Sequence, residues 1–129
     1  MADDESDDLF LIEHRLQKAG IKNPIVKFRD GEELIAFFDS QPGAPKPCVL
    51  LLDLKMPLVD GIDVLAWLRR HPDLAQLPVA VVTSSPTPLD RERARAAGAN
   101  EYHEKFPSAE ELSAIVARAS AHPFATATR

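Results

Sequence analysis

Several polar side chains that could together handle phosphate stand beside predicted strand ends. Asp53 and Thr83 each close an apolar run, and Lys105 ends a third, weaker strand. The acidic pair Asp3-Asp4 stands close to the start of the chain. A carboxylate, an acidic pair, a hydroxyl and an amine are the components of a site that holds Mg²⁺ and accepts a phosphoryl group.

The strand before Asp53 is the element that must position this chemistry. Its apolar run, residues 49–52, continues without a break and is followed by turn residues. This pattern predicts a strand buried on both faces of a parallel sheet. Ligands of open α/β sheets collect at the carboxyl ends of the strands, so Asp53 would meet a reactant while its backbone stays fixed.

The rest of the chain alternates between strand and helix patterns. Strands are expected at 25–28, 49–53, 79–83 and 101–104, and helices after Ser6, Gly31 and Gly61 and at 90–97 and 109–120. The proline-rich segment 41–47 is expected to be a loop. Alternating strands and helices predict an α/β fold with a doubly wound parallel sheet and helices on both faces.

The first helix begins beside the acidic pair. Ser6 is expected to be its N-cap residue, because a serine hydroxyl can accept a hydrogen bond from a free backbone N–H. Asp7 and Asp8 are expected in the first turn, where the helix dipole favours negative charge. They are therefore assigned to the helix rather than to the site.

The bulk properties describe one acidic domain. A chain of 129 residues is long enough for a single core, and its net charge of −5 argues against non-specific binding to nucleic acid or to an anionic membrane surface. The single cysteine excludes an internal disulfide, and no apolar run approaches membrane-spanning length. A cytoplasmic location is expected.

The order of the motifs resembles the receiver domain of two-component response regulators. The matching motifs are Asp3-Asp4, Leu52-Asp53-Leu54-Lys55-Met56-Pro57, Asp60-Gly61, Thr83-Ser84 and Lys105. The resemblance implies a receiver domain over residues 1–121, a C-terminal tail over 122–129, and a flavodoxin-like strand order 2-1-3-4-5. The proline-rich segment and the strand at 79–83 resemble those of stand-alone receivers, including receivers paired with bacterial phytochrome-type histidine kinases.

The resemblance also implies roles for the reactive side chains. Asp53 would be the phosphoacceptor, Thr83 would hydrogen-bond a phosphoryl oxygen, and Lys105 would neutralise the phosphoryl charge. Thr83 and Tyr102 would form a switch that transmits phosphorylation to the surface.

The metal ligands implied by the resemblance surround the same carboxylate. Asp3, Asp4, Asp53 and the backbone carbonyl of Lys55 would hold Mg²⁺. Carboxylates that crowd together repel one another unless a cation lies between them, so metal affinity also follows from the residues themselves.

The predicted function is that of a single-domain response regulator. It would take a phosphoryl group from a sensor histidine kinase or a phosphotransfer protein and signal through a changed surface, with no enzyme activity beyond self-catalysed phosphoryl acceptance and hydrolysis. The alternative is a receiver-like adaptor that binds protein partners without being phosphorylated. A phosphatase with Asp53 as nucleophile would want a second acid at the position of Lys55.

Two departures from the family pattern affect these expectations. The order Lys105-Phe106-Pro107 separates the lysine from the proline, so the peptide bond after Lys105 is expected to be trans. Only Met1 and Ala2 precede the acidic pair, so strand 1 is expected to be truncated or missing, with only a stub over 1–3. We expect a longer native chain to supply the missing residues. Otherwise the open strand edges would favour a homodimer or pairing with another chain.

Overall fold

The computed structural model describes residues 1–40, 47–84 and 87–121. Most of the predicted loop at 41–47 and the whole predicted tail at 122–129 lie outside the described residues, so neither expectation is tested. In chain order the elements are α1 (Ser6–Lys18), α2 (Gly31–Asp39), β1 (Leu50–Leu52), α3 (Gly61–Arg70), β2 (Val79–Thr83), α4 (Pro88–Ala96), β3 (Glu101–Glu104) and α5 (Ala109–Ser120).

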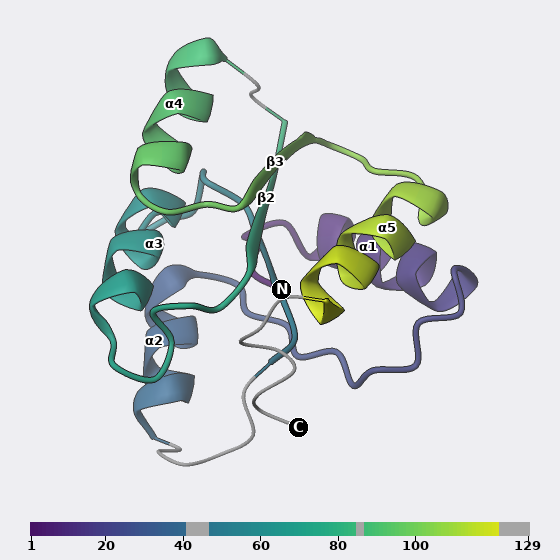
Figure 1. Ribbon diagram of the computed structural model, residues 1–129, viewed down its shortest axis with the longest axis horizontal. Coiled ribbons are helices and arrows are strands. Elements are labelled where there is room, and N and C mark those ends of the chain that lie inside the picture. Colours follow the sequence, from purple (N-terminus) through teal and green to yellow (C-terminus); the bar gives the residue numbers. More distant parts are fainter. Residues whose placement is uncertain (41–46, 85–86, 122–129) are drawn as a thin grey trace.

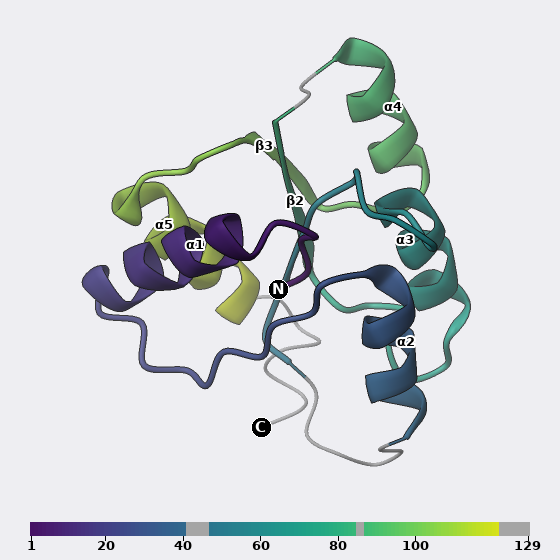
Figure 2. The same ribbon diagram turned by 180° about the vertical axis from the view of Figure 1, so that it is seen from behind.

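The strands form a parallel sheet between two layers of helices. Strand order is β1-β2-β3, with Leu51 opposite Ala80 and Val81 opposite Tyr102. Helices α1 and α5 lie on one side of the sheet, and α2, α3 and α4 lie on the other (Figures 1 and 2). The predicted doubly wound α/β architecture is therefore confirmed.

Alternate side chains of the strands supply two hydrophobic cores. Leu52 and Val81 face the layer of α2, α3 and α4, where they pack with buried residues such as Leu65. Leu51 faces the layer of α1 and α5. Because both faces are covered, β1 is apolar throughout and β2 is apolar up to Thr83, as the apolar runs in the sequence predicted.

The start of the chain forms only a rudiment of a strand, as expected. Ala2 makes isolated parallel bridges to Phe28 on one side and to Leu52 on the other. These bridges place Phe28, Ala2 and β1 side by side, which is the beginning of the 2-1-3-4-5 order. Of the predicted strand at 25–28, only Phe28 is paired, and the prediction was wrong for residues 25–27. These residues lack a strand partner because the neighbouring strand is reduced to the stub at Ala2.

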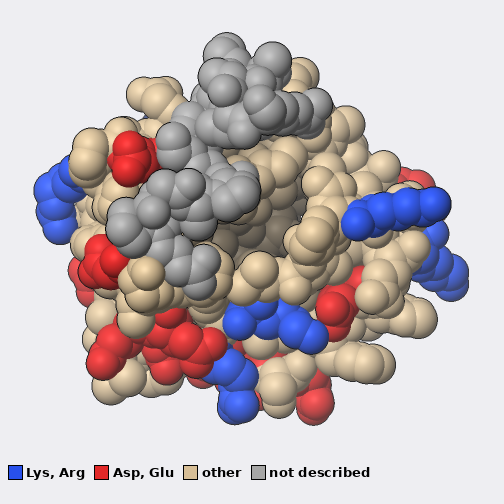
Figure 3. All heavy atoms as spheres, turned by 90° about the horizontal axis from the view of Figure 1, so that it is seen from below, with Lys and Arg blue, Asp and Glu red and all other residues tan. Residues whose placement is uncertain are grey.

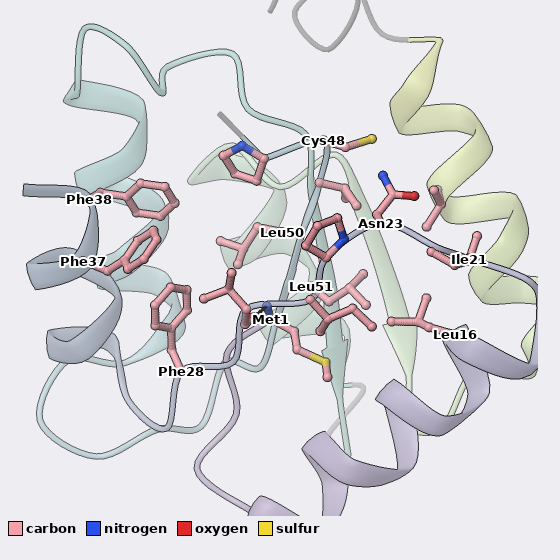
Figure 4. Close-up of a pocket in the computed structure, with 16 residues that line it drawn as sticks. Met1, Leu16, Ile21, Asn23, Phe28, Phe37, Phe38, Cys48, Leu50 and Leu51 are labelled. Atoms are coloured by element: carbon pink, nitrogen blue, oxygen red, sulfur yellow. Dashed lines mark hydrogen bonds between the residues drawn. The ribbon is translucent and has the colours of Figure 1, made fainter. Parts of the chain in front are cut away.

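A groove continues from the stub between residues 25–28 and β1. Its volume is about 450 Å³, and Phe28 and Phe37 line one side while Leu16 and Ile21 line the other (Figure 4). The terminal nitrogen of Met1 donates to the carbonyl of Val26 at 2.6 Å, as a strand amide would. Burial lowers the pKa of this amine to about 5. The view from below shows a hollow among uncharged side chains (Figure 3).

Helix starts are mostly fixed by short polar side chains. Asp30, Asp60, Thr87 and Ser108 each accept a hydrogen bond from a backbone N–H in the first turn of the helix that follows. The predicted N-cap role of Ser6 was wrong, because Ser6 is already helical and the N-cap residue, Glu5, makes no side-chain capping bond within the described residues. None of the helices in the described part of the chain is both long and apolar enough to cross a membrane.

Candidate functional site

Asp3, Asp4 and Asp53 gather at the carboxyl end of the sheet. One carboxylate oxygen of each lies within 4.8 Å of the others. The backbone bonds of the short N-terminal stub position them: the N–H of Asp53 donates to Ala2 at 2.9 Å, and the N–H of Asp3 donates to Phe28 at 3.0 Å. The predicted acidic cluster therefore exists although strand 1 is almost absent.

Burial of the acidic cluster disfavours the charged form of its carboxylates. Asp53 is 4% exposed, and burial, with repulsion from Asp3, raises its pKa to about 6. Burial also raises the pKa of Asp3, although its hydrogen bond to Lys105 opposes this change. The Oδ1 atom of Asp53 is buried and accepts no hydrogen bond from the residues that the structure describes. An unsatisfied carboxylate oxygen within an acidic cluster fits a hard cation such as Mg²⁺.

Lys105 lies against the same carboxylates. Its ammonium is 2.8 Å from Asp3 Oδ2, 2.7 Å from Asp8 Oδ2 and 3.6 Å from Asp53 Oδ2. Burial alone would lower the pKa of Lys105, but its hydrogen bonds to Asp3 and Asp8 and the charge of Asp53 raise it above its ordinary value. The structure thus brings Lys105 close to Asp53, while its role in neutralising a phosphoryl charge stays a prediction.

Asp8 also contacts the site, although the sequence favoured a helix-dipole role for it. Its Oδ2 accepts a hydrogen bond from the ammonium of Lys105. The two residues are 97 positions apart in the chain. No local pattern could have indicated this pair, because residues so far apart become neighbours only in the folded chain.

The peptide bond between Lys105 and Phe106 is cis, so the expectation of a trans bond was wrong. Contacts on both sides determine the local path of the chain. The backbone N–H of Lys105 donates to Thr83 at 2.8 Å, while the carbonyls of Phe106 and Pro107 both accept hydrogen bonds from Arg15. The residue order argued for a trans bond on local preference alone, which these tertiary contacts override.

The predicted switch residues lie on the two neighbouring strands. Thr83 is fully buried at the end of β2, next to β1 in the sheet. Tyr102 is partly buried on β3 and packs against the core, with the guanidinium of Arg91 at 5.1 Å from its ring centroid. Burial raises the pKa of the Tyr102 phenol.

Lys55 has its backbone at the site and its side chain outside it. Its backbone N–H hydrogen-bonds to Asp53, whereas its ammonium is mostly exposed and lies 3.8 Å from Asp90 Oδ2. The close packing behind Asp53 depends on Gly61, because a Cβ there would lie 2.5 Å from the Asp53 carbonyl oxygen. The metal-ligand role of the Lys55 carbonyl stays a prediction.

Known proteins match this arrangement in both sequence and structure. A model of the response regulator receiver domain matches residues 1–117. Response regulator Rcp1 of Synechocystis sp. is 35% identical over 88 residues, which make up 66% of this chain and 60% of Rcp1. The structure of its Mn²⁺-bound form has a TM-score of 0.74 at 30% identity, covering 92% of this chain and 88% of that chain.

Two further solved structures extend the match. The bacteriophytochrome response regulator AtBRR has a TM-score of 0.78 at 31% identity, covering 90% of this chain and 86% of its own. The phosphorylated cyanobacterial phytochrome response regulator RcpA has a TM-score of 0.76 at 30% identity, covering 92% and 87%. The family model matches most of the chain, and solved receiver structures share its fold. This chain therefore belongs to the response regulator receiver domain family.

Proposed function

We propose that this protein is a single-domain response regulator that acts in the cytoplasm. Asp53 accepts a phosphoryl group from a sensor histidine kinase or a phosphotransfer protein, and the protein then signals through a changed surface. The supporting observation is the gathering of Asp3, Asp4 and Asp53 within 4.8 Å, with the Lys105 ammonium 3.6 Å from Asp53.

The residues of the chain divide the chemistry among them. Asp53 is ionised at neutral pH, because its pKa of about 6 lies below 7. Its oxygen attacks the phosphorus of a phosphohistidine, so an O–P bond forms while the N–P bond to the imidazole breaks. Lys105 compensates the charge of the resulting acyl phosphate, and Thr83 donates a hydrogen bond to a phosphoryl oxygen.

A divalent cation completes the proposed site. Asp3, Asp4 and Asp53 offer the carboxylate oxygens that Mg²⁺ prefers, and the Lys55 carbonyl is proposed as a further ligand. When bound, the cation neutralises negative charge on the carboxylates and on the transferred group. The Mn²⁺-bound structure of the similar Rcp1 supports a metal at this acidic cluster.

The similar proteins also suggest the signalling context. AtBRR is a bacteriophytochrome response regulator and RcpA is a phytochrome response regulator that was solved in a phosphorylated form. We therefore propose a phytochrome-type histidine kinase as the phosphoryl donor. The adaptor alternative is favoured by the limited pairing beside Asp3 and Asp4, since Ala2 makes only isolated bridges, to Phe28 and to Leu52, within the described residues.

Intact-protein mass measurement after incubation with acetyl phosphate and Mg²⁺ tests the proposal. One phosphoryl group should be gained, EDTA should prevent the gain, and Asp53→Ala should abolish it. Asp63→Ala, which removes an exposed carboxylate of α3, should gain phosphate normally. Uptake that persists in Asp53→Ala would place the acceptor elsewhere. A lack of uptake from acetyl phosphate and from histidine kinases would favour the adaptor.

A further inference from the structure

Among the described residues Lys105 has three carboxylate partners, and one of these three lies outside the acidic cluster. Asp3 and Asp53 belong to the group whose oxygens converge as a metal site, whereas Asp8 does not. The Asp8 contact is also the shortest of the three, at 2.7 Å. A cation held by Asp3, Asp4 and Asp53 would compete with Lys105 for those oxygens but would leave Asp8 available.

The position of Asp8 on α1 suits this contact. The side chain of Lys105 is only 6% exposed and that of Asp8 is 22% exposed, so the pair is shielded from water on one side. Asp7, the preceding residue, is exposed and makes no ion pair with any residue in the described part of the chain. Both acids have the same charge and lie in the same first turn, so the helix dipole affects them alike.

We propose that Asp8 is a positioning residue that holds Lys105 beside Asp53 while a divalent cation occupies the acidic cluster. This inference rests on the proposed function of the site. An ammonium has three N–H donors. One donor on Asp8 keeps the charge at the edge of the cluster, and another stays directed toward Asp53, where the phosphoryl group would arrive.

Loss of Asp8 should therefore affect metal binding through Lys105. Without Asp8, the carboxylate partners left to the ammonium within the described part of the chain are Asp3 and Asp53, which are metal ligands in the proposed site. Lys105 would then compete with the cation for the same oxygens. The lysine would also lose the contact that fixes its direction during phosphoryl uptake.

Calorimetric titration with MgCl₂ tests this inference without any phosphoryl transfer. Asp8→Ala should weaken Mg²⁺ binding by about threefold to tenfold, whereas the matched variant Asp7→Ala should change it by less than about twofold. When Lys105 is also replaced by Met, Asp8→Ala should change the Mg²⁺ affinity no more than Asp7→Ala does. Circular dichroism of each variant verifies folding, and Asp8→Asn replaces Asp8→Ala if the latter does not fold.

A second readout follows the lysine itself. In the Mg²⁺-loaded protein, the ¹⁵N signal of the Lys105 ammonium should be protected from exchange in the wild type and in Asp7→Ala, and lost in Asp8→Ala or Asp8→Asn. Equal effects of Asp7→Ala and Asp8→Ala on Mg²⁺ binding, an undiminished Asp8→Ala effect in the Lys105→Met background, or a protected signal without Asp8 would each overturn the inference. Failure of phosphoryl uptake from every donor would overturn the proposed function while leaving these binding measurements interpretable.

Discussion

At the scale of single residues, Asp53 shows how a reactive group can reduce stability. Its carboxylate is almost fully buried beside Asp3, and Oδ1 has no hydrogen-bond partner among the described residues. Burial and repulsion raise its pKa from 3.8 to about 6. The folded protein therefore holds a proton on Asp53 more tightly than the unfolded chain does. Ionisation of Asp53 at neutral pH consequently lowers the free energy of unfolding.

The first prediction concerns the pH dependence of this cost. Because the folded-state pKa is the higher one, stability without divalent cations should fall as pH rises from 3.8 through about 6. Asp53→Asn removes the charge with little change in shape. At pH 7.5 in EDTA it should raise the free energy of unfolding by roughly 1–3 kcal/mol, with a smaller gain towards pH 4.

Urea unfolding at several pH values measures this difference. Asp63→Asn provides the control, because that carboxylate is exposed on α3 and should give a difference near zero. Added Mg²⁺ should stabilise the wild type but not Asp53→Asn. If the wild type is as stable as Asp53→Asn at pH 7.5 in EDTA, the buried charge of Asp53 does not destabilise the folded protein and the prediction is wrong.

At the scale of elements, the N-terminal stub at Ala2 is the least extensively paired part of the sheet. The Ala2 stub pairs with Phe28 and Leu52, and the apolar groove beyond Met1 continues in the same direction. The Met1 nitrogen already occupies the place of a strand amide at Val26. The groove therefore has both the backbone register and the apolar lining to receive an extended segment.

The second prediction is that an added apolar segment stabilises the fold. Fusion of Ile-Leu-Leu-Val directly before Met1 should raise the free energy of unfolding by roughly 2–4 kcal/mol, because apolar side chains become buried and strand edges become paired. The added segment should also reduce self-association through open edges, measured by gel filtration. A Gly-Ser-Gly-Ser fusion of equal length is the control, and an equal gain from it would disprove this reading of the groove.

At the scale of the whole molecule, Arg69 ties separate segments together. From α3 its guanidinium donates to the backbone carbonyls of Ala75 and Leu77 before β2. It also donates to the Gly98 carbonyl and to the side-chain Oδ1 of Asn100 before β3. The carbonyl of Gly98 accepts at 2.6 Å. One planar side chain thus donates hydrogen bonds to backbone carbonyls of two connecting segments.

The third prediction follows from this arrangement. Arg69→Met should lower the free energy of unfolding by roughly 2–4 kcal/mol, because several partly buried carbonyls lose their donor. Arg69→Lys should recover little, since an ammonium cannot reach both segments with fixed geometry. Urea denaturation compares them with Arg70→Met, an exposed neighbour on the same helix. Equal stability of Arg69→Met and Arg70→Met would refute the role of Arg69.

The fourth prediction links the site to the molecular surface. If Thr83 transmits phosphorylation to Tyr102, Thr83→Ala should still gain a phosphoryl group on Asp53 but show smaller amide shifts along β3 and α4. Thr83 is buried at the end of β2, between the strands that bear Asp53 and Tyr102, so a change at its hydroxyl can reach both. Two-dimensional NMR before and after acetyl phosphate measures the shifts, and full-size shifts in Thr83→Ala would exclude this route.

Local patterns in the sequence were sufficient for the α/β architecture, whereas the acidic cluster was predicted through the resemblance to receiver domains. The apolar runs that end at Asp53 and at Thr83 were predictable, because a strand covered on both faces is apolar at successive positions. The weaker strand at 101–104 was also predicted with its observed bounds. Only the tertiary structure decided the contact of Asp8 with Lys105 and the cis bond that follows Lys105. The extent of pairing at 25–28 was also decided there, because a strand persists only where a neighbouring strand satisfies its backbone. Such contacts join distant parts of the chain, so no local period encodes them.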